Sequence, residues 1–265
     1  MTAVASGLPL LAYSPYETDR FGLRIFRGTP ELSDAPALID EIRREHVDVA
    51  ILRVPAQAQA LAATISEAGL PTIVADSLVQ YSADVRLRRD PPTAATSLRL
   101  RPAENRDRAN LEWMVRQIFD GYATHYHSNP LFDPARILDG YAEWAVRHID
   151  ASEQGRLAWI VEVDGEDAGF SCVEIAPDRG EARGVLNGVL PAKRGRGVYR
   201  SMLRAMLDRF ADDGLRRFVI STQAHNAAVQ RVWSSEHLTL ERSESTVHVN
   251  ALLGGGKTRA FAARV

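Results

Sequence analysis

Apolar positions along the chain change their spacing several times, and each spacing predicts one kind of element. A repeat of three to four residues places apolar side chains on one face of a helix, whereas β-branched runs and alternation are typical of strands. Strands that alternate with helices predict a small α/β layer. In the first part of the chain the predicted order is a strand at 24–28, a helix at 35–46, a strand at 47–55, a helix at 56–70 and a strand at 71–85.

The second part of the chain predicts several strands in succession. Residues 164–167 and 178–180 combine aspartate and glycine between alternating segments, which favours antiparallel hairpins. The predicted order is a strand at 97–103, helices at 110–122 and 134–149, strands at 158–163, 168–177 and 181–191, a helix from 198 to Gly214, a strand at 216–223, a short helix at 226–236 and a last strand or strand pair at 240–252.

A stretch rich in Pro, Ala and Thr separates these two parts. Residues 90–97 show no apolar periodicity, so we interpret them as a linker. We therefore expect an α/β (α+β) protein with a small α/β N-terminal domain at residues 1–96. A second domain at 97–253 would hold a mixed, mostly antiparallel sheet, and residues 254–265 would form a tail.

Charge and cysteine content narrow the class of protein. A formal net charge of −2 over 265 residues gives no general attraction to nucleic acid or to a membrane surface, so neither is expected as a partner. Cys172 is the single cysteine, which excludes an internal disulfide and fits a reducing cytoplasm. No apolar run approaches the roughly 20 residues of a membrane span. We expect a cytoplasmic protein without a metal ion.

The strongest chemical signal is a basic, glycine-rich turn directly before a helix. Gly195 and Gly197 would let a ligand approach the backbone, and Arg194 and Arg196 would add positive charge. A helix start also presents unpaired N–H groups and the positive end of its dipole, so the turn is typical of a phosphate site. The competing interpretation is a solvated basic turn without a ligand.

In its context this turn resembles the acyl-CoA site of the GCN5-related N-acetyltransferases (GNAT). Their signature, Gln/Arg-x-x-Gly-x-Gly/Ala, falls on residues 194–199, with Tyr199 in place of the last small residue. Their later Asn-x-x-Ala-x-x-x-Tyr segment is similar to Asn226, Val229 and Trp233. The resemblance covers residues 98–253 and implies the GNAT fold and acetyl-CoA, or another short acyl-CoA, as co-substrate.

Within that family the chain is most similar to bacterial amino-sugar N-acyltransferases of the dTDP-fucosamine acetyltransferase type. Residues 17–25, 123–149 and 217–233 carry this finer similarity. It implies that a dTDP-linked amino deoxy sugar is acylated by direct transfer in a ternary complex, in a protein compatible with a homodimer. The alternatives are another amine acceptor, such as an amino acid, an antibiotic or a protein N-terminus, or a GNAT fold that binds acyl-CoA without turnover. Polyamines fit poorly, because the loop at 123–134 offers only one carboxylate, Asp133.

The resemblance also implies roles for the residues that bind the acyl-CoA. A main-chain N–H of Val189 or Leu190 would polarise the thioester carbonyl. The diphosphate would be bound by the turn, and the rest of the carrier by Asn226 and Trp233. The residues of the turn are Arg194, Gly195, Arg196, Gly197, Val198 and Tyr199.

Several residues are candidates for the groups that accept and donate protons in the reaction. Glu181 stands before the turn at a spacing where some relatives place a general base, although an exposed turn residue is the alternative interpretation. His125 and His127 are rival bases or, with Tyr126, substrate contacts. Trp233 stands where relatives carry an acidic tyrosine, and an indole cannot give up its proton. Tyr199 is then a substitute acid, unless a water serves.

Overall fold

The computed structural model describes residues 9–87 and 97–254. The chain forms two compact units, and neither is continuous in sequence. The first combines residues 1–78, 123–136 and 243–265, and the second combines 79–122 and 137–242. This division differs from the expected boundary after residue 96, because strands β4 (Thr72–Asp84) and β10 (Thr239–Val249) each run from one unit into the other. The predicted linker at 90–96 and the tail beyond residue 254 lie outside the described residues.

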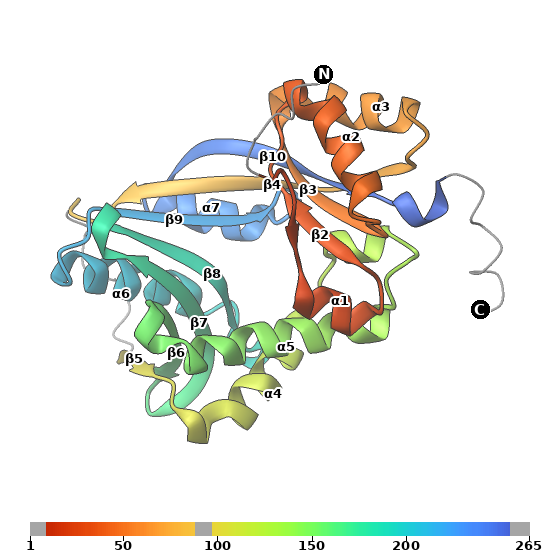
Figure 1. The fold of residues 1–265 in the computed structure, drawn as a ribbon. Coiled ribbons are helices and arrows are strands. Elements are labelled where there is room, and N and C mark those ends of the chain that lie inside the picture. The colour runs from red at the N-terminus through yellow and green to blue at the C-terminus, as the bar shows by residue number, and fades with distance from the viewer. Residues whose placement is uncertain (1–8, 88–96, 255–265) are drawn as a thin grey trace. The chain divides into compact units, whose positions relative to one another are not determined.

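The first unit is an α/β layer with strand order β1-β2-β3-β10-β4. Its β2 and β3 are parallel, and β10 runs antiparallel to β3. Helices α2 and α3 supply Leu38, Ile42, Leu61 and Ile65 to a core with one face of these strands (Figure 1). The elements other than β4 and β10 are β1 (Ala12–Tyr13), α1 (Pro15–Phe21), β2 (Ile25–Gly28), α2 (Ala35–Arg44), β3 (Val49–Pro55) and α3 (Ala60–Glu67).

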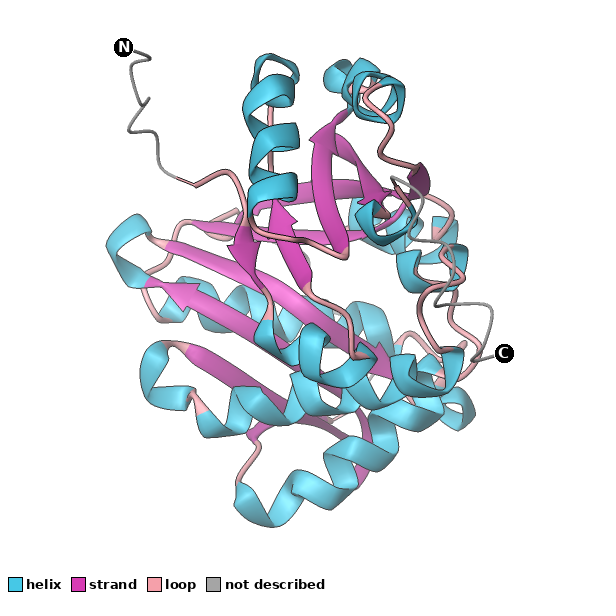
Figure 2. Cartoon of the chain, turned by 45° about the vertical axis from the view of Figure 1, so that its right-hand side comes forward, coloured by secondary structure: helices cyan, strands magenta, loops and turns pink. Residues whose placement is uncertain are grey.

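The second unit contains a mixed, mostly antiparallel sheet with strand order β4-β9-β8-β7-β6-β5. Antiparallel pairs join β5 to β8, and β8 and β9 are parallel. Helices cover both faces (Figures 1 and 2). The elements are β5 (Leu98–Pro102), α4 (Arg108–Phe119), α5 (Pro134–Asp150), β6 (Arg156–Val163), β7 (Glu166–Ala176), β8 (Glu181–Val189), α6 (Val198–Asp212), β9 (Arg217–Gln223) and α7 (Ala227–Ser235).

Two apolar clusters, one on each face, fix the helices of the second unit on its sheet. The cluster on the α6 side includes Met202, Phe210 and Trp233, and all three side chains are buried. The cluster on the opposite face joins α4 and α5 through Met114 and Ala145. The apolar stripe of α6 that the sequence shows is therefore the stripe that packs, and it holds the helix start in a fixed position.

A bulge and a separation of strands shape the second unit around β8. The register between β7 and β8 shifts so that Val185 is an extra residue on β8. The parallel ladder between β8 and β9 joins only Glu181–Gly184 to Arg217–Ile220. Beyond this ladder β9 is not paired with β8 in the described residues, so the main-chain groups on that edge of β8 toward Val189 are not used by β9.

The expected fold class, an α/β protein with a mixed, mostly antiparallel sheet, is confirmed. The sequence analysis did not predict α1, a helix of seven residues that ends at Gly22 with φ +67°. Its inward face carries the buried carboxylate Glu17 rather than an apolar repeat, so periodicity gave no signal. Within the described ranges no helix combines the length and the apolar character that a membrane span requires.

Candidate active site

The glycine-rich turn opens α6 as expected, with unpaired N–H groups. Gly195 and Gly197 have φ values of +76° and +77°, and Gly197 is the residue directly before the helix. The first donor of the helical ladder is the N–H of Ser201, which bonds to the Gly197 carbonyl at 3.0 Å. A Cβ added at either glycine would meet no described atom within 4 Å. Among the described residues, no turn hydrogen bond to the main chain uses the N–H groups of residues 195–197, so they remain available as an anion site requires.

The two arginines of the turn have different partners. Arg194 donates from Nε to the Val189 carbonyl and from Nη2 to the Ile118 carbonyl, each at 3.1 Å. Its guanidinium thus joins the end of β8 to the end of α4, although the sequence suggested that it faces phosphate. Arg196 is exposed and forms no ion pair with any described residue, so it remains the cation available to a ligand.

Two main-chain N–H groups, those of Val189 and Leu190, were expected to bind the thioester carbonyl, and their hydrogen bonds in the sheet distinguish them. The Leu190 N–H bonds to the Ala168 carbonyl at 2.9 Å, so it is committed to the sheet. Successive N–H groups of a strand point to opposite edges. The Val189 N–H therefore points away from β7, toward the edge where β9 has separated from β8. Val189, and not Leu190, has the N–H that can polarise a carbonyl.

Two hydrogen bonds of Tyr199 join the start of α6 to β8 and α7. The Tyr199 hydroxyl donates to Asn187 Oδ1 at 2.9 Å and accepts from Trp233 Nε1 at 3.1 Å. Burial raises the pKa of the Tyr199 phenol, and the indole hydrogen bond only partly opposes this. Asn187 reaches α6 because the bulge at Val185 reverses the alternation of β8. The Tyr199 O–H and the Trp233 indole N–H are thus both already donated to acceptors within the protein.

The end of β9 carries polar residues next to the end of α4. The Tyr122 hydroxyl donates to Gln223 Oε1, and Asn226 Nδ2 approaches the same hydroxyl at 3.4 Å. Asn226 also caps α7, since its side chain accepts from the Val229 N–H at 3.5 Å. His225 is exposed, with its ring centroid 6.3 Å from that of Tyr122. His225 is not among the residues predicted from the sequence, although its place between a strand and the capping asparagine is a usable signal.

Comparison with known proteins agrees with this geometry. Residues 114–236 match the acetyltransferase (GNAT) family, and this range contains the turn, β8, β9 and α7. The chain has the GNAT fold. No curated protein matches the chain.

Several solved structures share the GNAT fold. A GCN5-related N-acetyltransferase from Sphaerobacter thermophilus aligns with a TM-score of 0.61 and 11% identity, over 92% of this chain and 76% of its own. One from Kribbella flavida aligns with a TM-score of 0.54 and 13% identity, over 87% of this chain and 82% of its own. A tandem GNAT protein from the clavulanic acid biosynthesis pathway aligns with a TM-score of 0.56 and 14% identity, over 87% of this chain and 76% of its own.

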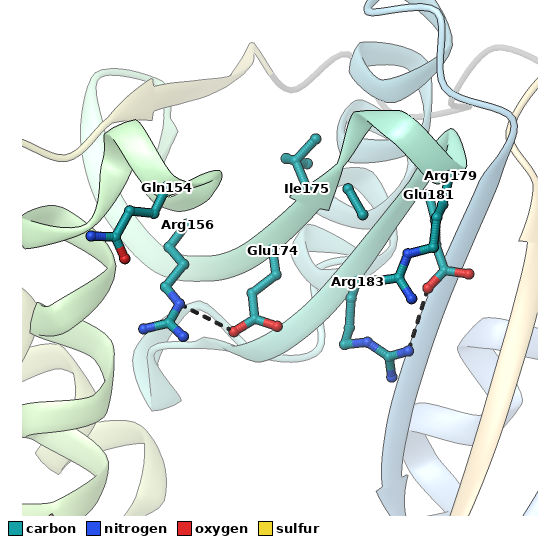
Figure 3. A pocket seen from close by; sticks show the side chains of 8 residues that line it. Gln154, Arg156, Glu174, Ile175, Arg179, Glu181 and Arg183 are labelled. Carbon is teal, nitrogen blue, oxygen red and sulfur yellow. Dashed lines mark hydrogen bonds and ion pairs between the residues drawn. The ribbon is translucent and has the colours of Figure 1, made fainter.

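Glu181 lies at the opposite end of β8 from the glycine-rich turn. Eight residues separate it from Val189, which in an extended strand is about 26 Å. Its carboxylate pairs with Arg217 at 2.5 Å and with Arg183 at 3.4 Å. It lines an open cavity of about 210 Å³ together with Arg183 and Arg179 (Figure 3). The structure thus places this predicted base in an ion-pair cluster, apart from the Val189 N–H.

The other predicted polar contacts belong to the first unit. His125 is buried, and its Nδ1 lies 2.8 Å from Nε2 of His248. The Tyr126 hydroxyl is bonded to Glu17 and lies 3.0 Å from Arg27 Nη2. His127 is exposed, and its Nδ1 accepts from the Thr124 N–H at 3.2 Å. Only His127 of these three predicted contacts has an exposed side chain.

Cys172 is a core residue of the second unit. Its side chain is fully buried, and the thiol donates weakly to the Ala145 carbonyl at 3.8 Å. Burial raises the pKa of the thiol, which disfavours the nucleophilic thiolate. The side chain therefore offers no covalent route for acyl transfer.

Proposed function

We propose that the protein is an acyl-CoA-dependent N-acyltransferase, with acetyl-CoA as the simplest donor. One observation carries this proposal: the start of α6 has N–H groups without a turn partner, and it follows the end of β8, where the Val189 N–H points away from β7. The N–H groups of residues 195–199, with Arg196, bind the diphosphate, and the Val189 N–H binds the thioester oxygen.

The reaction is a direct transfer between two bound substrates. The acceptor nitrogen attacks the thioester carbon, the C–S bond breaks, and the proton lost by the amine is finally carried by the CoA thiol. We propose His225 as the base, because it is exposed near Tyr122 at the end of β9. Tyr199 positions Asn187 and Trp233 and is not the proton donor, since its hydrogen is already bonded.

The binding part of this proposal is tested at the two ends of α6. Gly197→Val places a branched side chain where the diphosphate would lie, and we expect a loss of acetyl-CoA binding by calorimetry. Gly214→Val is the matched control, because Gly214 has a similar φ of +76° and also has open space around it. If Gly197→Val bound acetyl-CoA as the unchanged protein does, the ligand would not lie at this turn.

For the acceptor we propose a dTDP-linked amino deoxy sugar, supported by the sequence resemblance at residues 17–25, 123–149 and 217–233. Release of free thiol from acetyl-CoA, measured with dTDP-amino sugars, amino acids and peptides with a free N-terminus, tests this choice. Turnover with the sugars alone is expected. A preference for amino acids or peptides would retain the acyltransferase and replace the acceptor.

A second candidate is an acyl-CoA-binding protein without turnover. The bonded protons of Tyr199 and Trp233 favour it, because neither is available to the leaving thiolate. Turnover with any amine excludes this candidate. In an active protein, His225→Gln is expected to lower the rate at unchanged acetyl-CoA affinity, and an unchanged rate would exclude His225 as the base.

A further inference from the structure

Three polar side chains from neighbouring strands meet on the sheet of the first unit. Arg53 of β3, Thr246 of β10 and Asp76 of β4 form this group, which we call the Arg53 cluster. The Thr246 hydroxyl donates to Asp76 Oδ1 and accepts from Arg53 Nη1. Arg53 and Thr246 are directly paired in the register of β3 and β10. The cluster is therefore fixed by the backbone.

The carboxylate of this cluster is only half satisfied. The Asp76 side chain is 9% exposed, and its Oδ2 is buried without a hydrogen-bond partner among the described residues. Arg53 Nη1 approaches Oδ1 at 3.6 Å, the same oxygen that Thr246 uses. A self-sufficient Arg–carboxylate pair commonly uses both oxygens. A buried acceptor left unpaired costs about 1–3 kcal/mol, so Oδ2 lacks a donor that a ligand could supply.

The cation of the cluster is also incompletely compensated. Arg53 is 23% exposed, so part of its guanidinium is accessible. Burial lowers the pKa of Arg53 and the charge of Arg27 acts in the same direction, whereas Asp76, Glu244 and Tyr126 oppose this only in part. Arg27 is itself paired with Glu17 at 2.5 Å. An added anion would stabilise the charge of Arg53.

We propose that the Arg53 cluster binds a small ligand that presents an anionic oxygen to Arg53 and an adjacent O–H or N–H donor to Asp76 Oδ2. Phosphate monoesters, hydroxy acids and amino acids share this arrangement. The Arg53 cluster belongs to the first unit, and binding of a ligand to the cluster is measured without acyl-CoA. Its failure is therefore distinguishable from failure of the proposed acyl transfer.

Phosphate and sulfate provide the test, because at pH 8 both are mainly dianions of similar size but only hydrogen phosphate carries an O–H. Calorimetric titration of the whole chain at pH 8 is expected to show phosphate binding about 10-fold or more tighter than sulfate, as one charged hydrogen bond predicts. Asp76→Asn has nearly the same shape and offers an N–H to either ion, so we expect the preference to vanish.

Two further variants separate binding from folding. Arg53→Gln is expected to lose both ions, whereas Arg44→Gln, an exposed arginine of the same unit, is the matched control and should change neither. Circular dichroism confirms that each variant is folded, and Arg53→Lys replaces Arg53→Gln if the latter is not. Equal affinity of the unchanged protein for both ions, no binding at about 20 mM, or an equal loss in Arg44→Gln would overturn the proposal.

Discussion

At the scale of single residues, the protein bonds its polar side chains to one another where the sequence suggested free reactive groups. Tyr199 follows the glycine-rich turn at 194–197, yet its hydroxyl is hydrogen-bonded to Asn187 and Trp233 in the interior. Arg194 likewise binds two main-chain carbonyls. The groups left for a ligand are main-chain N–H groups, whose positions do not depend on a side-chain rotamer.

Tyr199→Phe tests the structural role of this hydroxyl. The change leaves the indole N–H and Asn187 Oδ1 without their partner, so we expect the free energy of unfolding to fall by about 1–3 kcal/mol. Urea denaturation followed by tryptophan fluorescence measures this fall. Tyr13→Phe, at a tyrosine that is 46% exposed, is the control. Unchanged stability combined with a large loss of turnover would instead return Tyr199 to the role of proton donor.

At the scale of elements, β8 positions the site through its bulge and its glycines. The bulge at Val185 turns Asn187 toward α6, and Gly188 lets α4 approach the strand. A Cβ at Gly188 would lie 2.4 Å from Cγ2 of Ile118. The same part of α4 is joined to Arg194, so the packing at Gly188 and the geometry of the turn are linked.

Gly188→Ala tests this packing. Because the added methyl group would overlap Ile118, we expect a destabilisation of about 1–3 kcal/mol in urea denaturation. Ile118→Ala removes Cγ2, the atom that the added methyl group would meet, and the double variant should recover part of the loss. Additive losses in the double variant would contradict the contact, since residues that touch are expected to couple.

At the scale of the whole molecule, each unit has its own core and its own titrating groups. All four tryptophans, at positions 113, 144, 159 and 233, belong to the second unit, so their fluorescence reports on that unit. The first unit contains the buried pair His125 and His248. Burial lowers the pKa of His248 to about 3, with the charges of Arg27 and Arg53 acting in the same direction. Burial also holds the pKa of His125 well below 6.5.

The histidine pair predicts that acid destabilises the protein. In the unfolded chain both imidazoles take up protons near pH 6.5, whereas in the folded chain they stay neutral until a much lower pH. The unfolded state therefore binds more protons in this window, and stability falls as the pH drops below about 6.5. Each histidine contributes a loss of up to about 2 kcal/mol at pH 5.

Urea denaturation at pH 7.5 and pH 5, followed by circular dichroism, measures this loss. His248→Gln keeps a hydrogen-bonding side chain without a titrating ring, so we expect the loss to shrink by about half. His46→Asn, at an exposed histidine with φ +49°, is the control, since asparagine tolerates this backbone conformation. An equal loss in the unchanged protein and in His248→Gln would exclude the pair as its source.

The sequence predicted most elements of this fold, because helix and strand patterns depend on neighbouring residues. It also predicted the turn at 194–197 and the helix that follows, since glycines, cations and an apolar stripe lie close together in the chain. It failed at α1, where buried Glu17 interrupts the pattern. The compact units divide within β4 and β10, and the domain boundary expected after residue 96 stays a prediction.

The sequence by itself determined most element types and the glycine-rich turn that opens α6. Only the tertiary structure decided that Val189 and not Leu190 has the free N–H, that Tyr199 is bonded to Trp233, and that Glu181 lies at the far end of β8. The physical reason is that local patterns fix what each segment forms. Strand register and long-range hydrogen bonds, which join residues distant in the chain, decide which of its polar groups remain available.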